Sequence, residues 1–206
     1  MALDLDALNR DIGHDPLAIT EFALGLDQTA ICTTNFRPFE AVILHLVTRV
    51  RPDIPVVWMD SGYNTPATYR FADELTRLLD LNLSIYHPRR SRAHRESLEG
   101  PMPTIDDPGH AAFTEEVKLE PFRRALAEAA PDVWFTALRA EDTPERSRMQ
   151  PLSRNADGLL KVAPVLHWNA KQMYQYLQAH DLPNNFDYFD PTKVEDKREC
   201  GLHLQH

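Results

Sequence analysis

Residues 29–62 read TAICTTNFRPFEAVILHLVTRVRPDIPVVWMDSG and alternate between two kinds of apolar pattern. The first part is a short β-branched run that ends in polar residues at Asn35, and the last is a continuous apolar run that stops at the polar sequence DSG. Between them, Pro38 can occupy a first helical turn, and apolar side chains then recur at helical spacing, namely Val42, Ile43, Leu46 and Val50. The stretch therefore predicts a strand, a helix and a second strand in succession.

The same alternation continues along the chain. Further helices are predicted over 65–81, 119–130 and 169–180, with Asn169 as the cap of the last, and further strands over 81–87, 132–140 and 159–168, the last as a strand or an edge segment. Residues 1–26 have the spacing of a helical lead-in, and residues 182–206 read as a polar tail that we expect to be mobile. Residues 88–108 are rich in Pro, Arg, Ser and Gly, so we expect a long excursion or mobile loop there.

Apolar runs that alternate with helices predict an α/β fold, in which a mostly parallel twisted sheet carries helices on both faces. The 206 residues favour a single domain, 1–206, with a sizeable core. Ligands of such sheets bind beyond the carboxyl ends of the strands. We therefore expect the polar strand tips at 32–37, 59–64 and 137–148 to converge on one crevice.

Composition excludes several classes of protein. The formal charge of −9 argues against non-specific nucleic-acid binding, although a local arginine cluster could still hold a small anion. No stretch approaches the roughly 20 apolar residues of a membrane span, and the acidic N-terminus is unlike a signal peptide, so a cytoplasmic location is expected. The 2 cysteines show no metal-binding spacing, which argues against zinc, an iron-sulfur cluster or a disulfide framework.

The first strand tip carries Thr33, Thr34 and Asn35, whose hydroxyl, amide and backbone N–H groups could hold an anion. The tip lacks the Gly-rich GK[ST] sequence of a Walker loop, and an ordinary helix cap is the alternative interpretation. The second tip carries Asp60, Ser61 and Gly62, followed by Tyr63, which could stack on a base or close a pocket. Here the alternative is a simple turn between a strand and a helix.

The third tip supplies arginines after a strand, namely Arg139, Arg146 and Arg148. Guanidinium groups match phosphate or sulfate oxygens with paired hydrogen bonds, so such a cluster suits an oxyanion. A solvated loop in which these arginines pair with Glu141 and Glu145 is the alternative.

The sequence KRECGLH, residues 197–203, places a cysteine in a charged tail where it can bury nothing. Cations lower the pKa of a thiol, and Lys197 and Arg198 precede Cys200 while His203 follows it. Gly201 leaves the thiol open to a bulky electrophile or to the thiol of a second protein. The alternative is an inert tail cysteine; Cys32, which follows two apolar residues, is expected in the core.

With these residues assembled, the chain resembles the thioredoxin-dependent phosphoadenylyl-sulfate (PAPS) reductases of the PP-loop adenine-nucleotide-binding superfamily. The resemblance runs from about residue 28 to the end, in the stretches RPDIPVVWMDSGYNTPATYRFADEL, VKLEPFRRAL, FTALRAEDTPERSR, QMYQYLQAHDL and KRECGLH. It implies that Cys200 attacks the sulfur of PAPS to give a cysteine S-sulfonate, and that thioredoxin or glutaredoxin then frees sulfite. It also implies a homodimer and no bound cofactor.

The resemblance assigns roles to individual positions. Substrate contacts fall on Thr33, Thr34, Asn35, Asp60, Ser61, Gly62, Lys118, Arg139 and Arg146, and the catalytic tail comprises Lys197, Arg198, Glu199, Cys200, Gly201 and His203. Where the family usually has Ser-Phe-Gly, this chain has Asn35, Phe36 and Arg37, and Arg37 could supply a compensating charge or block the site. The segment before the tail is also short.

Two alternatives remain open from the sequence. Iron-sulfur relatives, which reduce adenylyl sulfate, carry a Cys-Cys pair before the lysine that Lys118 matches, whereas this chain has FTEEV there, so PAPS is the expected substrate. The altered loop at Asn35 leaves room for a diverged relative that acts on adenylyl sulfate or another sulfonated nucleotide. A nucleotide-binding or redox protein without turnover is the second alternative.

Overall fold

The computed structural model describes residues 3–192, and these contain one six-stranded sheet with the strand order β3-β2-β1-β4-β6-β5. Neighbouring strands run parallel except at one edge, where β5 pairs antiparallel with β6. The predicted mostly parallel sheet is therefore confirmed. The strands are β1 (Ala30–Thr34), β2 (Pro55–Met59), β3 (Asn82–Tyr86), β4 (Val133–Phe135), β5 (Leu152–Arg154) and β6 (Leu160–Val162).

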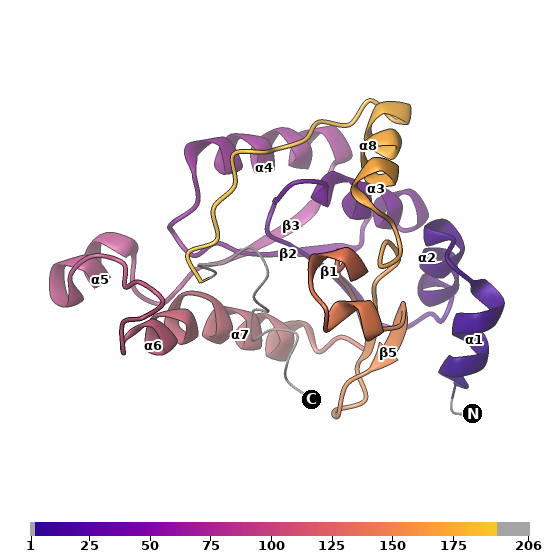
Figure 1. Cartoon of the computed structure of the whole chain (residues 1–206), viewed down its shortest axis with the longest axis horizontal. Helices are drawn as coiled ribbons and strands as arrows, with labels where there is room; N and C mark the ends of the chain where they lie inside the picture. The colour runs from indigo at the N-terminus through magenta and orange to yellow at the C-terminus, as the bar shows by residue number, and fades with distance from the viewer. Residues whose placement is uncertain (1–2, 193–206) are drawn as a thin grey trace.

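Helices cover both faces of the sheet, as predicted. In Figure 1, α3 (Glu40–Val50), α4 (Pro66–Leu79) and α8 (Ala170–Ala179) lie above the sheet, and α6 (His110–Thr114) and α7 (Glu120–Ala129) lie below it. Successive strand side chains point to opposite faces. Accordingly, Cys32 belongs to the large cluster that includes α3 and α4, while Ile31 packs in a smaller cluster with Phe122 of α7.

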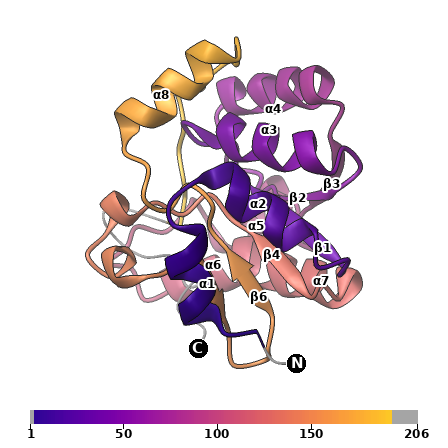
Figure 2. The same ribbon diagram turned by 90° about the vertical axis from the view of Figure 1, so that its right-hand side faces the viewer.

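The predicted helical lead-in consists of two helices, α1 (Leu5–Ile12) and α2 (Pro16–Leu24). The side chains of Asp4 and Asp15 accept hydrogen bonds from the first turns of these helices. At the other end of the chain, the predicted cap of α8 is confirmed, because Asn169 and Gln172 form a reciprocal capping box. Figure 2 shows α1 and α2 near β6, at the end of the sheet whose edge strand is β5.

The long loop expected over 88–108 is a wrong prediction, because this segment contains the helix α5 (Arg92–Glu99). Ser91 caps α5 by accepting a hydrogen bond from the His94 N–H. The one buried residue of α5 is Arg95, whose guanidinium lies 4.7 Å from the centre of the Phe113 ring. An arginine therefore occupies the buried position at which a helix normally has an apolar residue. For this reason the sequence of α5 lacks the apolar periodicity by which a helix is predicted.

Two further details bear on the sheet. The strand expected over 132–140 ends at Phe135, and β5 follows the polar third tip in a stretch for which no element was predicted. Cys32 is completely buried, as predicted, and burial, together with the charge of Glu40, raises the pKa of its thiol well above the usual value. Within residues 3–192, none of the helices is both long and apolar enough to cross a membrane.

Candidate active site

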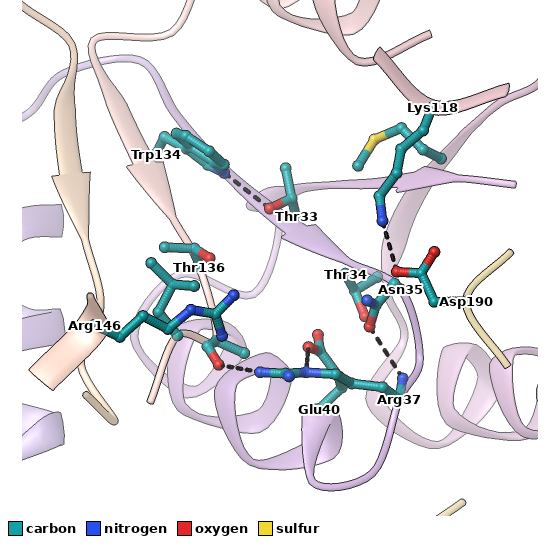
Figure 3. Close-up of a pocket in the computed structure, with 13 residues that line it drawn as sticks. Thr33, Thr34, Asn35, Arg37, Glu40, Lys118, Trp134, Thr136, Arg146 and Asp190 are labelled. Carbon is teal, nitrogen blue, oxygen red and sulfur yellow. Dashed lines mark hydrogen bonds and ion pairs between the residues drawn. The ribbon is translucent and has the colours of Figure 1, made fainter. Parts of the chain in front are cut away.

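A pocket lies at the carboxyl edge of the sheet, between the tips of β1 and β4 (Figure 3). An adjoining hollow shares four of its lining residues and extends to the tip of β2 and to residues 188–192. The predicted convergence of the three strand tips is thus confirmed. The pocket is lined by Thr33, Thr34, Asn35, Arg37, Glu40, Met59, Lys118, Trp134, Thr136, Ala137, Leu138, Arg146 and Asp190.

The β1 tip forms a tight turn without glycine. Thr34 Oγ1 accepts a hydrogen bond from the Phe36 N–H (3.1 Å), and Asn35 Oδ1 accepts one from the Arg37 N–H (3.2 Å). Phe36 has a φ of 54°, a left-handed conformation that is unusual for an aromatic residue, and its side chain is fully buried. Burial of Phe36 therefore holds the turn that a glycine would adopt without strain. Thr33 is fixed separately, because its Oγ1 accepts from the Trp134 Nε1–H at 2.8 Å.

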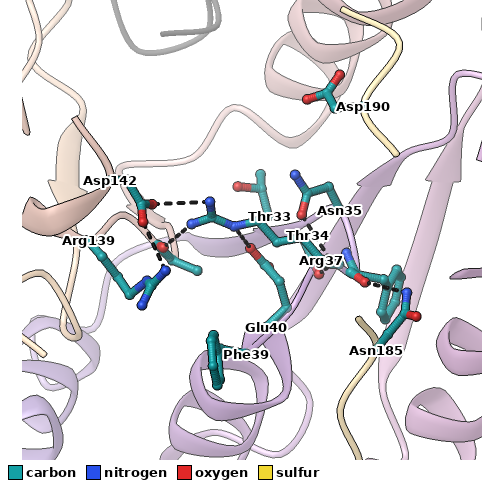
Figure 4. A network of polar contacts seen from close by, with 12 residues as sticks. Thr33, Thr34, Asn35, Arg37, Phe39, Glu40, Arg139, Asp142, Asn185 and Asp190 are labelled. Carbon is teal, nitrogen blue, oxygen red and sulfur yellow. Dashed lines mark hydrogen bonds and ion pairs between the residues drawn. The ribbon is translucent and has the colours of Figure 1, made fainter. Parts of the chain in front are cut away.

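Arg37 reaches across the pocket and is held on three sides (Figure 4). Its Nε donates to Glu40 Oε1 (3.1 Å), its Nη1 to Asp142 Oδ2 (3.1 Å) and its Nη2 to the Ala137 carbonyl (2.8 Å). The sequence left open whether Arg37 supplies a compensating charge or blocks the site. In the structure its guanidinium lines the pocket, and its charge is balanced by the carboxylates of Glu40 and Asp142. Arg37 thereby ties the β1 loop to the segment that follows β4.

Asp142 is the centre of this arginine cluster. Besides Arg37, it accepts hydrogen bonds from Arg139 Nη2 (2.9 Å) and from Arg146 Nη1 (2.8 Å). Arg146 is almost completely buried and lines the pocket, whereas Arg139 lies outside the lining, pairs also with Glu141, and stacks on the Phe39 ring. Of the three predicted arginines, Arg139 and Arg146 therefore lie together, whereas Arg148 is exposed. Among the arginines, Arg37 and Arg146 line the pocket.

The pKa values of two carboxyl groups in the cluster are shifted in opposite directions. Burial raises the pKa of Glu40 above its usual value, and the nearby charge of Arg37 only partly offsets this effect. Burial would also raise the pKa of Asp142, but the charges of Arg37, Arg139 and Arg146 outweigh it, so the pKa of Asp142 lies below its usual value. Asp142 is therefore ionised at neutral pH and keeps the three guanidinium groups close to one another.

Lys118 approaches from the opposite side of the pocket. It belongs to a π-helical turn, η1 (Glu115–Leu119), between α6 and α7, and such turns often occur at functional sites. Its Nζ donates to Asp190 Oδ2 (2.6 Å) and to Thr192 Oγ1 (2.9 Å). The sequence predicted Lys118 but missed Asp190, and it also missed Glu40 and Asp142 as acidic partners of the cations.

The β2 tip lies beside the adjoining hollow. Asp60 Oδ1 accepts hydrogen bonds from the Gly62 N–H (2.9 Å), from Asn64 Nδ2 (2.8 Å) and from Tyr69 Oη (2.9 Å). Burial, with Asp60, raises the pKa of Tyr69 to about 12. Gly62 has a φ of 81°, which explains the need for glycine in this turn. Of the predicted residues here, Ser61 lines the hollow.

Tyr63 differs from the expectation that it would stack on a base or close the pocket. Its ring is only 6% exposed and packs against Phe113, with the guanidinium of Arg92 4.7 Å from the ring centre. It lines neither the pocket nor the hollow. Tyr63 therefore fastens the β2 loop to α5 and α6.

The catalytic tail lies outside the described residues. This applies to Lys197, Arg198, Glu199, Cys200, Gly201 and His203. Residues 182–192, here called the strap, run from the end of α8 past α4 (Figure 1), and Asp190 of the strap lines the pocket. The strap places Asp190 and Thr192 beside Lys118, so the chain that leads to Cys200 leaves from the rim of the pocket.

Comparisons with known proteins agree on one family. The family model of the phosphoadenosine phosphosulfate reductase domain matches residues 30–189. Phosphoadenosine 5'-phosphosulfate reductase of a Synechococcus species is 37% identical, covering 91% of this chain and 89% of its own length. The corresponding Synechocystis protein is 38% identical and covers 98% of this chain and 91% of its own length.

Solved structures show the same fold. The PAPS reductase of Candida auris, determined as a phosphate complex, has a TM-score of 0.77 at 20% identity and covers 90% of this chain and 91% of its own. An FMN adenylyltransferase of Candida glabrata has a TM-score of 0.60 at 15% identity, covering 89% of this chain and 60% of its own. The expected PP-loop type of α/β fold is thereby confirmed. On the family model and the sequence identities, the chain belongs to the phosphoadenosine phosphosulfate reductase family.

Proposed function

We propose that this protein is an oxidoreductase that reduces PAPS to sulfite and adenosine 3',5'-bisphosphate in sulfate assimilation. The observation that carries the proposal is the cation-lined pocket at the carboxyl edge of the sheet, from whose rim the chain continues to Cys200. Lys118, Arg37 and Arg146 line this pocket, and such donors suit the oxygens of a phosphosulfate.

In the first step, the Cys200 thiolate attacks the sulfur of the sulfate group. A sulfur–sulfur bond forms, the bond between that sulfur and the phosphate oxygen breaks, and adenosine 3',5'-bisphosphate leaves with the electron pair. The enzyme then carries a cysteine S-sulfonate. Negative charge that develops on the leaving phosphate is stabilised by the cations of the pocket.

In the second step, a thiolate of thioredoxin or glutaredoxin attacks the Cys200 sulfur. Sulfite leaves with the electron pair of the sulfur–sulfur bond, and a mixed disulfide forms between the two proteins. The second thiol of the reductant resolves this disulfide, so a dithiol supplies both electrons. The protein itself needs no bound cofactor for this chemistry, and we propose that it works as a homodimer in the cytoplasm.

Chain length supports the placement of Cys200 at the pocket. Cys200 follows Thr192 by eight positions, and Thr192 contacts Lys118. Eight residues span at most about 28 Å when fully extended, which is ample for the cysteine to reach the pocket. Cys32, by contrast, is completely buried with a raised thiol pKa, which makes it a poor nucleophile.

Intact-protein mass spectrometry after mixing reduced protein with PAPS, without thioredoxin, tests the proposal. We expect a sulfonate-sized mass gain in the wild type and in a Cys32→Ala control, and none in Cys200→Ser. Thioredoxin should then remove the added mass and release sulfite. A mass gain that persists in Cys200→Ser, or that is absent from the wild type, would contradict the proposal.

The same experiment with adenylyl sulfate decides the substrate. We expect PAPS to react faster than adenylyl sulfate, because the chain lacks the Cys-Cys pair of the iron-sulfur relatives before Lys118. The altered β1 tip is the observation that favours adenylyl sulfate or another sulfonated nucleotide. Equal or greater reaction with adenylyl sulfate would favour this alternative.

A further inference from the structure

A carboxylate lies inside the cation-lined pocket. Asp190 lines both the pocket and the adjoining hollow, and Figure 3 shows the side chain of Lys118 directed toward it. An anionic group of a ligand would be attracted by Lys118 and repelled by Asp190. The Asp190 charge therefore determines how much of the Lys118 charge is available to a ligand.

Lys118, Asp190 and Thr192 form a closed cluster. Lys118 Nζ donates to Asp190 Oδ2 and to Thr192 Oγ1, and Thr192 donates to Asp190 Oδ1 from its hydroxyl (2.7 Å) and from its N–H (3.0 Å). A lysine has three N–H donors, so two of the three are already in use. A ligand can gain the full charge of Lys118 only by replacing the carboxylate.

The pair is strong because it is mostly removed from water. The side chains of Lys118 and Asp190 are 12% and 9% exposed. Burial alone would raise the pKa of Asp190, but the charge of Lys118 and the hydrogen bonds from Lys118 and Thr192 outweigh it, so the pKa lies below its usual value. Asp190 is thus an anion throughout the physiological pH range.

The cluster also fixes one end of the strap. Nearer α8, Asn184 Oδ1 accepts from the Phe39 N–H (2.7 Å), and the Asp187 carbonyl accepts from Thr65 Oγ1 (2.8 Å). Asp190 and Thr192 hold the far end, next to the chain that continues to Cys200. Loss of the contact between Lys118 and Asp190 would release this end and leave the earlier contacts intact.

We propose that Asp190 is a positioning residue that holds Lys118 as an internal counter-anion until the anionic group of the substrate displaces it. The displacement frees the Asp190–Thr192 end of the strap, so substrate binding and release of this end are coupled through Lys118. This inference rests on the proposed function, because it takes the pocket to be the site of a sulfonucleotide.

Equilibrium binding of adenosine 3',5'-bisphosphate to the full chain tests the inference. In Asp190→Asn an amide keeps a hydrogen-bond acceptor for Lys118 while the competing charge is gone, so we expect the Kd to fall by about tenfold. The matched control is Asp187→Asn on the same strap, because that side chain is exposed and makes no hydrogen bond or ion pair with residues 3–192. Its Kd should equal that of the wild type.

The direction in which the Kd changes in Asp190→Asn distinguishes a positioning role of Asp190 from a purely structural one. A structural role would predict weaker binding in Asp190→Asn, and either weaker or unchanged binding would overturn the inference. Hydrogen exchange of the amides of 188–192 gives a second readout, and saturating nucleotide should speed their exchange in the wild type. Unchanged or slower exchange would also count against displacement.

Inorganic phosphate distinguishes failure of this inference from failure of the proposed function. If the nucleotide binds none of the proteins, the proposed function fails. Thermal denaturation measured at increasing concentrations of inorganic phosphate still reports on Lys118. We expect phosphate to stabilise Asp190→Asn more than the wild type or Asp187→Asn. Equal stabilisation, or none in any of the three, would overturn the role of Asp190.

Discussion

Arg37 joins two carboxylates from different parts of the chain, and the Glu40 partner is almost completely buried, with a side chain 5% exposed. In Arg37→Ala, Glu40 and Asp142 lose this partner, and a buried carboxylate without its partner is costly. Because Arg37 itself is 22% exposed, we expect a loss of about 2 kcal/mol in the free energy of unfolding, below the usual range for a fully buried pair. Urea denaturation at neutral pH measures it.

The matched control combines Arg37→Ala with Glu40→Gln. A neutral amide does not need the guanidinium to offset a buried charge, so the double variant should recover part of the lost stability. If Arg37→Ala is as stable as the wild type, or if Glu40→Gln makes it worse, the pair does not stabilise the loop.

At this scale the sequence indicated the cations of the site better than the anions. Arg146 could be singled out because guanidinium groups suit an oxyanion, and the family resemblance indicated Lys118 and Arg37. Nothing in that chemistry indicates an acidic group in the same pocket, so Asp142 and Asp190 were missed. Their partners are set by the tertiary fold, since Asp190 lies 72 positions from Lys118.

Helix α3 begins without a capping side chain of its own. Its N-cap is Phe39, in a left-handed conformation with a φ of 71°, and the Phe39 N–H donates instead to Asn184 Oδ1 of the strap at 2.7 Å. The strap thus supplies the acceptor for the N-cap N–H, which a Glu or Gln at the third helical position provides in a capping box. In Asn184→Ala we expect a loss of about 1 kcal/mol in the free energy of unfolding, the net contribution of one such hydrogen bond.

Asn184→Asp is the matched control, because it keeps the oxygen acceptor and places a negative charge near the positive end of a helix. Urea denaturation of the three proteins, with hydrogen exchange at the first turn of α3, makes the comparison. Faster exchange of that turn in Asn184→Ala, and not in Asn184→Asp, is the expected result. Equal exchange in all three would show that the strap does not stabilise the helix.

The elements that the sequence predicted are those with a regular apolar pattern. The succession of β1, α3 and β2 could be read from residues 29–62, because both strands are buried and the helix has an apolar stripe. Helix α5 was missed because Arg95 is its one buried side chain, and β5 was missed because an edge strand of three residues has too short a pattern. Periodicity finds elements that bury apolar side chains and fails for those that bury charge.

Across the whole molecule, two pairs of histidines join segments that are distant in the sequence. His45 of α3 lies beside His180 at the end of α8, with ring centres 4.8 Å apart, and its Nδ1 is 3.0 Å from Tyr176 Oη. His14, between α1 and α2, contacts His167 ahead of α8, with ring centres 4.1 Å apart. Both pairs bear on the position of α8 and hence on the strap that follows it.

Acid should weaken the fold through these two pairs. Burial, with the nearby charges of His180 and Arg49, lowers the pKa of His45, and burial, with His14, lowers that of His167. In the unfolded chain both groups titrate near the usual pKa of about 6.5. A lowered pKa in the folded state means that the unfolded chain binds protons first, so stability is fully present above about pH 6.5 and is lost as the pH falls through the lowered values.

Urea unfolding of the wild type and of His45→Gln/His167→Gln at about pH 8 and about pH 5.5 isolates this contribution. Glutamine can still accept a hydrogen bond from Tyr176 but does not titrate, so the variant should lose less stability than the wild type between the two pH values. Glu40, whose raised pKa acts in the opposite direction, is present in both proteins and cancels in the comparison. Equal losses in the two proteins would mean that the histidine pairs do not make the packing of α8 sensitive to acid.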